Sequence, residues 1–288
     1  MSAPARPRFS GRVETETAAT GEARAADGVQ IAWRAYGQGE PVVLVMGFMG
    51  SGHHWFRLLP HLAADRRAIV LDNRGTGLSD RPRGLWSMHQ LAADVLAVLD
   101  DAGLEWAHVV GASMGGMIAQ HLALAHPERI RSLTLCCTSA RGGGRSGPPP
   151  WRMVASLGLR PLLGPGRTMQ VALPLLYSER TRRGSPERLA EEFALRAADA
   201  TPLTTALGQF AAISRHDTRS RLGALSVPAL VLHGDEDQLV PLAAGRELAA
   251  LIPGAELELL SGCGHVLTTD CEREAAEAIG GFLGRVEA

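Results

Sequence analysis

The stretch HVVGASMGG at residues 108–116 places Ser113 between small residues, at the junction of two different patterns. Residues 108–110 read as a short buried strand, and residues 114–125 read as an apolar helix. A chain that reverses this sharply strains its backbone at the turn, and small residues two positions before and after let it approach itself. The serine hydroxyl then stands exposed above the end of the strand. The stretch therefore predicts a strand, a tight turn and a helix, with Ser113 as a nucleophile.

The same alternation of short apolar runs and helical segments extends along most of the chain. Continuous apolar runs are typical of buried parallel strands, and the helices between them cover the faces of the sheet. The sequence therefore predicts an α/β fold with a mostly parallel central sheet and helices on both faces. The strands are expected at His108–Val110, Gln30–Tyr36, Pro41–Met46, Ala68–Leu71, Leu133–Cys137, Ala229–His233 and Glu256–Leu260, and the helices at Met88–Ala102, Met114–Ala125, Leu242–Ala250 and Glu272–Leu283.

The alternation breaks late in the sheet, at residues 139–222. This segment opens with a turn-rich stretch at residues 141–150 and then reads as helices only, among them Pro186–Ala198 and Pro202–Ser214. An all-helical insertion at this place predicts a cap over the carboxyl ends of the strands, where open α/β sheets bind ligands. We expect residues 1–24 to be a poorly ordered tail, 25–138 and 223–288 to form the core, and 139–222 to form the cap.

Composition excludes several kinds of chemistry. All 29 basic residues of the 288 are arginine, so Schiff-base catalysis and a phosphate-binding lysine are absent. The net charge of −1 provides no field for nucleic acid or an anionic membrane. No apolar stretch approaches the length of a membrane span. Four cysteines are too few for a disulfide framework and favour a reducing cytoplasm. We expect a small-molecule partner, with the chain a monomer or a homodimer.

Two loops after later strands supply a base and an acid for Ser113. A serine needs a base to take its proton, and the base needs a carboxylate to orient it. His265 follows the strand at residues 256–260 and is the only one of ten histidines beyond the acidic loop at residues 234–241. Both loops follow parallel strands, so they reach the same edge of the sheet as Ser113. From the residues alone, Asp235, Glu236 and Asp237 compete for the role of acid.

These motifs together resemble the α/β-hydrolase superfamily, from about residue 28 to residue 283. Its Gly-x-x-Asp-x-x-x-Pro pattern matches residues 234–241 and implies that Asp237 is the acid. Its D-x-R-G-x-G-x-S loop matches residues 72–79, which we interpret as scaffolding near the site. Residues 93–141 resemble the enol-lactonase branch of carboxylic ester hydrolases. Residues 45–47 are similar instead to polyketide methylesterases of the aclacinomycin type.

The resemblance also implies where the oxyanion is held. Attack on a carbonyl needs preorganised N–H donors. The expected donors are the backbone N–H groups of Met114, after the nucleophile, and Phe48, in the loop after the strand at residues 41–46. The superfamily usually has histidine where this chain has Met46. Methionine cannot form the hydrogen bonds that a histidine would use to brace this loop.

The predicted function is a serine hydrolase that cleaves a small to medium, largely apolar ester or lactone through an acyl-enzyme on Ser113. Apolar residues of the cap between 153 and 176 are expected to line the pocket. The chemistry requires no cofactor and no metal, and we reject Cys263, His265 and Cys271 as zinc ligands because His265 is needed for catalysis. Acyl transfer and perhydrolysis use the same residues, and a non-catalytic ligand receptor is a further alternative.

Overall fold

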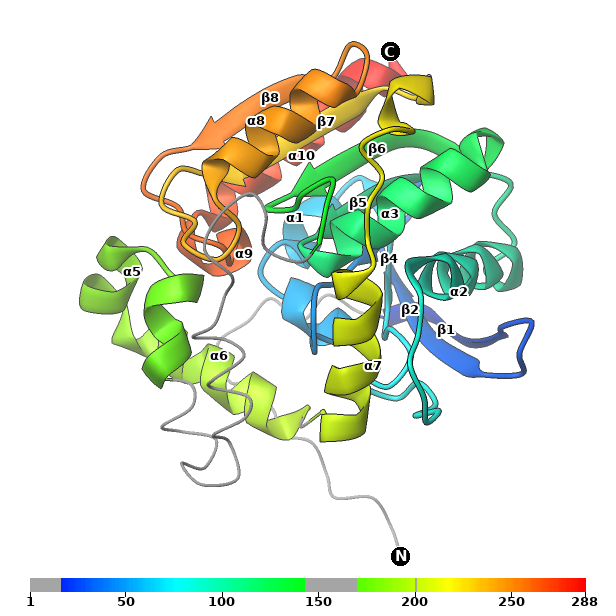
Figure 1. The fold of residues 1–288 in the computed structure, drawn as a ribbon, viewed down its shortest axis with the longest axis horizontal. Helices are drawn as coiled ribbons and strands as arrows, with labels where there is room; N and C mark the ends of the chain where they lie inside the picture. The colour runs from blue at the N-terminus through cyan, green and yellow to red at the C-terminus, as the bar shows by residue number, and fades with distance from the viewer. Residues whose placement is uncertain (1–16, 143–169, 200) are drawn as a thin grey trace, which may run out of the picture.

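The computed structural model describes residues 17–142, 170–199 and 201–288, and these ranges form an eight-stranded sheet with flanking helices (Figure 1). The strand order is β1-β2-β4-β3-β5-β6-β7-β8. Only the pairs β1/β2 and β2/β4 are antiparallel, so the predicted mostly parallel α/β fold is confirmed. The strands are β1 Thr17–Arg24, β2 Gln30–Tyr36, β3 Glu40–Val45, β4 Arg66–Leu71, β5 Ala107–Ala112, β6 Ile130–Cys136, β7 Ala229–Gly234 and β8 Glu256–Leu260.

Helices cover both faces of the sheet (Figure 1). One apolar core lies between the sheet and α2, α3 and α8, and the other lies between the sheet and α1, α9 and α10. Strands β5 and β7 and the last four residues of β3 are almost wholly buried because they are covered from both sides. The helices of the core are α1 Leu59–Leu62, α2 Met88–Asp101, α3 Met114–Ala125, α8 Leu242–Leu251, α9 Leu267–Asp270 and α10 Glu272–Glu287, with 3-10 turns η1 Gly52–Trp55, η2 Pro127–Arg129 and η3 Leu222–Ala224.

In the described part of the insertion between β6 and β7, every regular element is a helix, as expected for a cap. The insertion includes α5 Glu179–Gly184, α6 Pro186–Ala198 and α7 Leu203–Ser214, which run from the left of the view in Figure 1 to its lower centre. Thr205 of α7 donates a hydrogen bond to the carbonyl of Gly75, and buried Glu192 of α6 accepts one from Thr269. These contacts hold the cap against the core.

The predicted organisation differs from the structure at the start of the core, and part of it falls outside the described residues. Thr17–Arg24 forms β1, so the sheet begins eight residues before the predicted start of the core at residue 25. This edge strand is polar, and its pairing with β2 is what fixes it in place. The predicted turn-rich hinge and the apolar cap residues between 153 and 169 lie outside the described residues, apart from positions 141 and 142.

A buried pair of histidines fastens the end of the cap to the core. His216 donates from Nε2 to the carbonyl of Ser139 (3.1 Å), which leaves its Nδ1 to accept from Nε2 of His121 in α3 (3.2 Å). Both side chains are buried. Burial lowers the pKa of His121 to about 3 and that of His216 to about 4. Both imidazoles are therefore neutral in the folded protein at neutral pH.

Stability is expected to fall as the pH drops below about 6.5, because these histidines take up protons only in the unfolded chain. Protonation of each histidine in the unfolded chain lowers the stability by roughly 1–2 kcal/mol between pH 6.5 and pH 5, since the folded-state pKa values near 3 and 4 lie below this window. Urea denaturation at pH 7, 6 and 5 measures the loss. His216→Gln should give a shallower pH dependence than the wild type. Equal slopes in His216→Gln and the wild type would contradict this account.

Candidate active site

Ser113 lies in the turn between β5 and α3, in a backbone conformation that non-glycine residues rarely adopt. Its φ and ψ are 54° and −118°. Its N–H donates to the carbonyl of Cys136 in the neighbouring strand (2.8 Å), which holds the turn in place. A side chain at Gly115 would overlap the carbonyl oxygen of Val45, and one at Gly111 would overlap the carbonyl of Gly115. Glycine at both positions therefore lets β3, β5 and α3 meet closely enough to present Ser113.

Three predicted residues meet in one hydrogen-bonded chain at the carboxyl ends of the strands. Nε2 of His265 lies 3.0 Å from Oγ of Ser113, and Nδ1 of His265 lies 2.8 Å from Oδ2 of Asp237. Ser113 follows β5, Asp237 follows β7 and His265 follows β8. Residues separated by 152 positions in the chain thus come into contact because parallel strands end on one side of the sheet.

The carboxylate of Asp237 is held by backbone donors and is sealed from water. Its side chain is 0% exposed, and Oδ1 accepts from the N–H groups of Leu239 and Val240, each at 2.8 Å. Its two competitors point elsewhere. Asp235 accepts from the N–H of Gly262, and Glu236 accepts from the N–H of Glu179; both acids are exposed. Of the three acids, only Asp237 reaches His265.

A second histidine, His233, lies beside Asp237 but is not part of the hydrogen-bonded chain of Ser113, His265 and Asp237. Nε2 of His233 donates to the carbonyl of Val240 (2.9 Å) and lies 3.6 Å from Oδ2 of Asp237. Burial lowers the pKa of His233, so the imidazole is neutral and acts as a hydrogen-bond donor to the loop. His233 therefore supports the loop that carries Asp237. This role of His233 could not be predicted from the residues around it, because it depends on which face of the sheet a strand residue points to.

The loop at residues 46–52, which we call the oxyanion loop after its predicted role, passes directly beside Ser113. A Cβ at Gly47 would lie 3.1 Å from Cβ of Ser113 and 3.7 Å from its Oγ. Met114 is the first residue of α3, so its N–H has no acceptor within the helix and is available to an anion. Phe48 directly follows Gly47. The two predicted N–H donors thus belong to the two segments that border Ser113.

Residues 72–79 anchor both ends of the oxyanion loop, which agrees with their predicted scaffolding role. Nδ2 of Asn73 donates to the carbonyl of Met46 (2.8 Å). Oδ1 of Asp72 accepts from the N–H of Gly52 (2.8 Å) and from the guanidinium of Arg34 (2.9 Å). Both side chains are buried. The loop at residues 72–79 therefore provides part of the support for the oxyanion loop that a histidine at position 46 would have provided.

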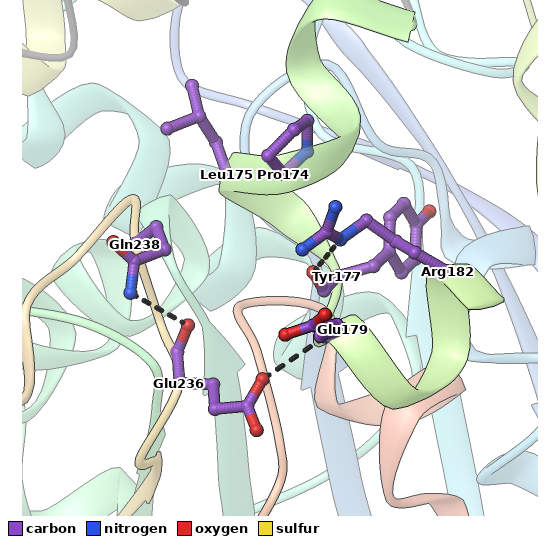
Figure 2. Close-up of a pocket in the computed structure, with 7 residues that line it drawn as sticks. All are labelled: Pro174, Leu175, Tyr177, Glu179, Arg182, Glu236 and Gln238. Atoms are coloured by element: carbon purple, nitrogen blue, oxygen red, sulfur yellow. Dashed lines mark hydrogen bonds between the residues drawn. The ribbon is translucent and has the colours of Figure 1, made fainter.

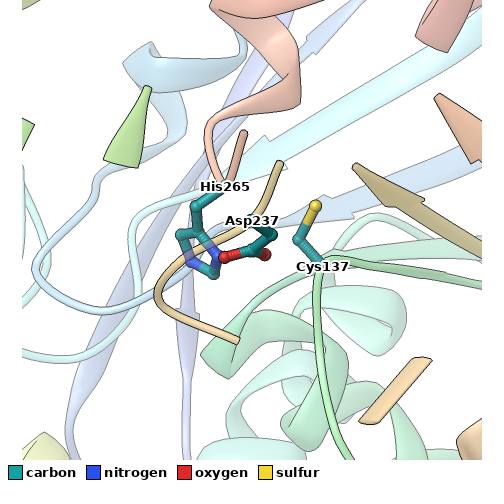
Figure 3. A group of neighbouring side chains, drawn as sticks. All are labelled: Cys137, Asp237 and His265. Carbon is teal, nitrogen blue, oxygen red and sulfur yellow. The ribbon is translucent and has the colours of Figure 1, made fainter. Parts of the chain in front are cut away.

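A thiol completes the surroundings of the acid (Figure 3). The sulfur of Cys137, a carboxylate oxygen of Asp237 and a ring nitrogen of His265 all lie within 4.8 Å of one another. Cys137 follows β6 with φ 45° and is 1% exposed. Burial raises its thiol pKa well above the usual range, so the sulfur stays protonated and packs behind Asp237. The group of Cys137, Asp237 and His265 differs from Cys263, His265 and Cys271, the three residues considered as zinc ligands. All four cysteines are free and buried.

A cavity of about 330 Å³ lies where residues 174–182 of the cap meet the loop of Asp237 (Figure 2). It contains none of Ser113, Asp237 and His265. Across it, the N–H of Glu179 donates to Glu236 (3.1 Å), which links α5 to the acidic loop. The cavity is lined by Pro174, Leu175, Tyr177, Glu179, Arg182, Glu236 and Gln238.

Comparison with known proteins places the chain in a family. Residues 40–269 match the sequence profile of the α/β hydrolase fold, so the chain belongs to the α/β-hydrolase family and is a hydrolase, as the sequence motifs predicted. RutD of Azorhizobium caulinodans, a candidate carbamate hydrolase, is 34% identical over 257 residues, which cover 88% of this chain and 95% of RutD.

Two solved structures have the same fold over nearly their whole length. A thermophilic esterase from Thermogutta terrifontis aligns with a TM-score of 0.83 and 26% identity, covering 94% of this chain and 100% of the esterase. The enol-lactonase from Burkholderia xenovorans aligns with a TM-score of 0.82 and 27% identity, covering 92% of this chain and 100% of the lactonase. Within the described ranges, no helix has the length and apolar character needed to cross a membrane.

Proposed function

We propose that this hydrolase cleaves a carboxylic ester or lactone with Ser113 as nucleophile. The observation that carries the proposal is the hydrogen-bonded chain from Oγ of Ser113 through the two ring nitrogens of His265 to Asp237, at 3.0 Å and 2.8 Å. A serine becomes nucleophilic when a neighbouring base accepts its proton, and the buried carboxylate stabilises the imidazolium that results.

The reaction proceeds in two halves. Nε2 of His265 takes the proton from Ser113 while Oγ attacks the substrate carbonyl, and the N–H groups of Phe48 and Met114 hold the oxyanion. As the tetrahedral intermediate collapses, the alcohol leaves with the proton from His265, and the acyl group stays on Ser113. Water then gives its proton to His265, attacks the acyl-enzyme and releases the acid, and the proton returns to Ser113.

Support for an ester or lactone comes from the structural neighbours, which include an esterase and an enol-lactonase. A carbamate is the second candidate, because the relative RutD is a candidate carbamate hydrolase. Attack on a carbamate would leave a carbamoyl group on Ser113 by the same steps. The substrate partner is a small molecule in either case.

A substrate panel and covalent capture test this function. The panel contains p-nitrophenyl esters of graded acyl length, simple lactones and a p-nitrophenyl carbamate. A fluorophosphonate should add its mass to the wild-type chain at Ser113, and Ser113→Ala should neither be labelled nor turn over any substrate. Labelling without turnover on any substrate, even with an alcohol or peroxide as acceptor, would instead favour a receptor. Product formed only with such an acceptor would identify an acyltransferase or perhydrolase.

A further inference from the structure

Met49, in the oxyanion loop, has a strained backbone like that of Ser113. Contacts from the core alone do not fix its conformation. Met49 has φ 59°, a left-handed conformation that favours glycine. Such a conformation persists only where surrounding contacts fix it. Core side chains bond Met46 and Gly52, at the two ends of the loop. Met49 lies in the middle, next to the predicted oxyanion donor Phe48.

Two side chains of the cap bind both polar groups of the Met49 backbone. Oε1 of Gln209, in α7, accepts from the N–H of Met49 (2.8 Å). Oγ1 of Thr201, which precedes α7, shares its proton between the carbonyl of Met49 (3.2 Å) and the carbonyl of Asp199 (3.3 Å). Gln209 is 0% exposed and Thr201 is 6% exposed, so water does not compete for these bonds. We call this pair of contacts the Met49 clamp.

We infer that Gln209 and Thr201 are positioning residues for the oxyanion hole. The inference rests on the proposed function, in which the N–H of Phe48 holds the oxyanion. The N–H of Met49 belongs to the peptide unit that follows Phe48. Fixing that peptide restricts the ψ angle of Phe48, which is one of the two backbone angles that relate it to the peptide carrying the N–H of Phe48. The cap thus completes the hole from outside the core.

The chemistry of Gln209 supports a functional reason for its place. Its Oε1 must face Met49 because only the oxygen of the amide can accept a hydrogen bond. Its Nε2 is then turned away, and it finds no acceptor among the residues that the structure describes. A buried amide with unused donors lowers stability relative to an apolar residue of the same shape. The hydrogen bond from the N–H of Met49 to Oε1 explains why a glutamine occupies this buried position.

Two variants remove the clamp with little change in shape. Gln209→Met removes the acceptor for Met49 N–H, and Thr201→Val removes the donor to Met49 carbonyl. For the best p-nitrophenyl ester, we expect Gln209→Met to lower kcat about tenfold or more with KM within about twofold, since a misplaced donor affects the transition state and not the bound ester. The affinity for an alkyl trifluoromethyl ketone, which forms an oxyanion adduct with Ser113, should fall by a similar factor. Thr201→Val should act in the same direction, and Thr201→Ser should restore the wild-type values.

Gln120→Met is the matched control. Gln120 is also 0% exposed, and it bonds the carbonyl of Ser139 and the hydroxyl of Thr218, away from the oxyanion loop. It should leave kcat and ketone affinity within about twofold of the wild type. Equal losses in Gln120→Met and Gln209→Met, or an unchanged ketone affinity in Gln209→Met, would overturn the inference and leave the proposed function standing. A wild-type protein that neither turns over an ester nor binds the ketone would overturn both.

Discussion

Asp237→Asn is expected to lower kcat for ester hydrolysis by about 10⁴-fold, the loss typical of an acid replaced by its amide in such a triad. In the wild type, Nδ1 of His265 donates to Oδ2 of Asp237 at 2.8 Å, which leaves Nε2 free to accept the proton of Ser113. The amide nitrogen of asparagine would favour the other tautomer, with a proton on Nε2 facing Ser113. The base would then be blocked while the shape of the site is kept. Steady-state kinetics with a p-nitrophenyl ester measure the loss.

Asp235→Asn and Glu236→Gln are the controls, because both acids lie in the same loop but are exposed and bond backbone N–H groups. Each should keep kcat within about threefold of the wild type. If Asp235→Asn were as damaging as Asp237→Asn, the loop's shape and not the carboxylate of Asp237 would be the important feature. Near-ultraviolet circular dichroism of all three variants checks that the tertiary packing is kept.

Gly115→Ala is expected to destabilise the fold by about 3 kcal/mol or more, which is large for the addition of one methyl group. The new Cβ would overlap the carbonyl oxygen of Val45 and would lie 2.9 Å from that of Met46. Neither carbonyl can yield easily, because Val45 pairs with Gly111 of β5 and the carbonyl of Met46 accepts a hydrogen bond from Asn73. Helix α3 would have to move away from the sheet and take Ser113 with it. Urea denaturation at pH 7 measures the effect.

Gly280→Ala is the matched substitution at a harmless position. Gly280 lies within α10, and a Cβ there would meet nothing within 4 Å. Alanine in a helix interior should raise stability by about 0.5–1 kcal/mol. Opposite signs for the two glycine substitutions are thus expected. A loss of less than about 1 kcal/mol in Gly115→Ala would mean that the approach of α3 to β3 can relax.

The strands and the order of the loops could be predicted because buried parallel strands read as short apolar runs, and all seven predicted strands exist with bounds shifted by three residues at most. Strand β1 was missed because TAATGEAR is polar and has no apolar run. The choice of Asp237 over Asp235 needed the family resemblance, since both acids occupy one short loop. The structure separates them by burial.

Other parts of the site were beyond sequence reasoning because they depend on contacts across the chain. Gln209 and Met49 are separated by 160 residues, and nothing in either neighbourhood indicates the other. Cys137 ends the predicted strand Leu133–Cys137, but its place behind Asp237 depends on the adjacency of β6 and β7. Such contacts follow from the order of the strands in the sheet and from the docking of the cap, neither of which is contained in the sequence pattern.

The distribution of the site along the chain has a consequence for the protein during its synthesis. Ser113 leaves the ribosome 152 residues before His265, and the cap and Asp237 lie between them. At about 5–20 residues per second, this interval is on the order of ten seconds. The nascent chain carries its nucleophile throughout this time without the base that activates it. Under the proposed mechanism, a newly made chain therefore becomes reactive only when its last strand, β8, has joined the sheet.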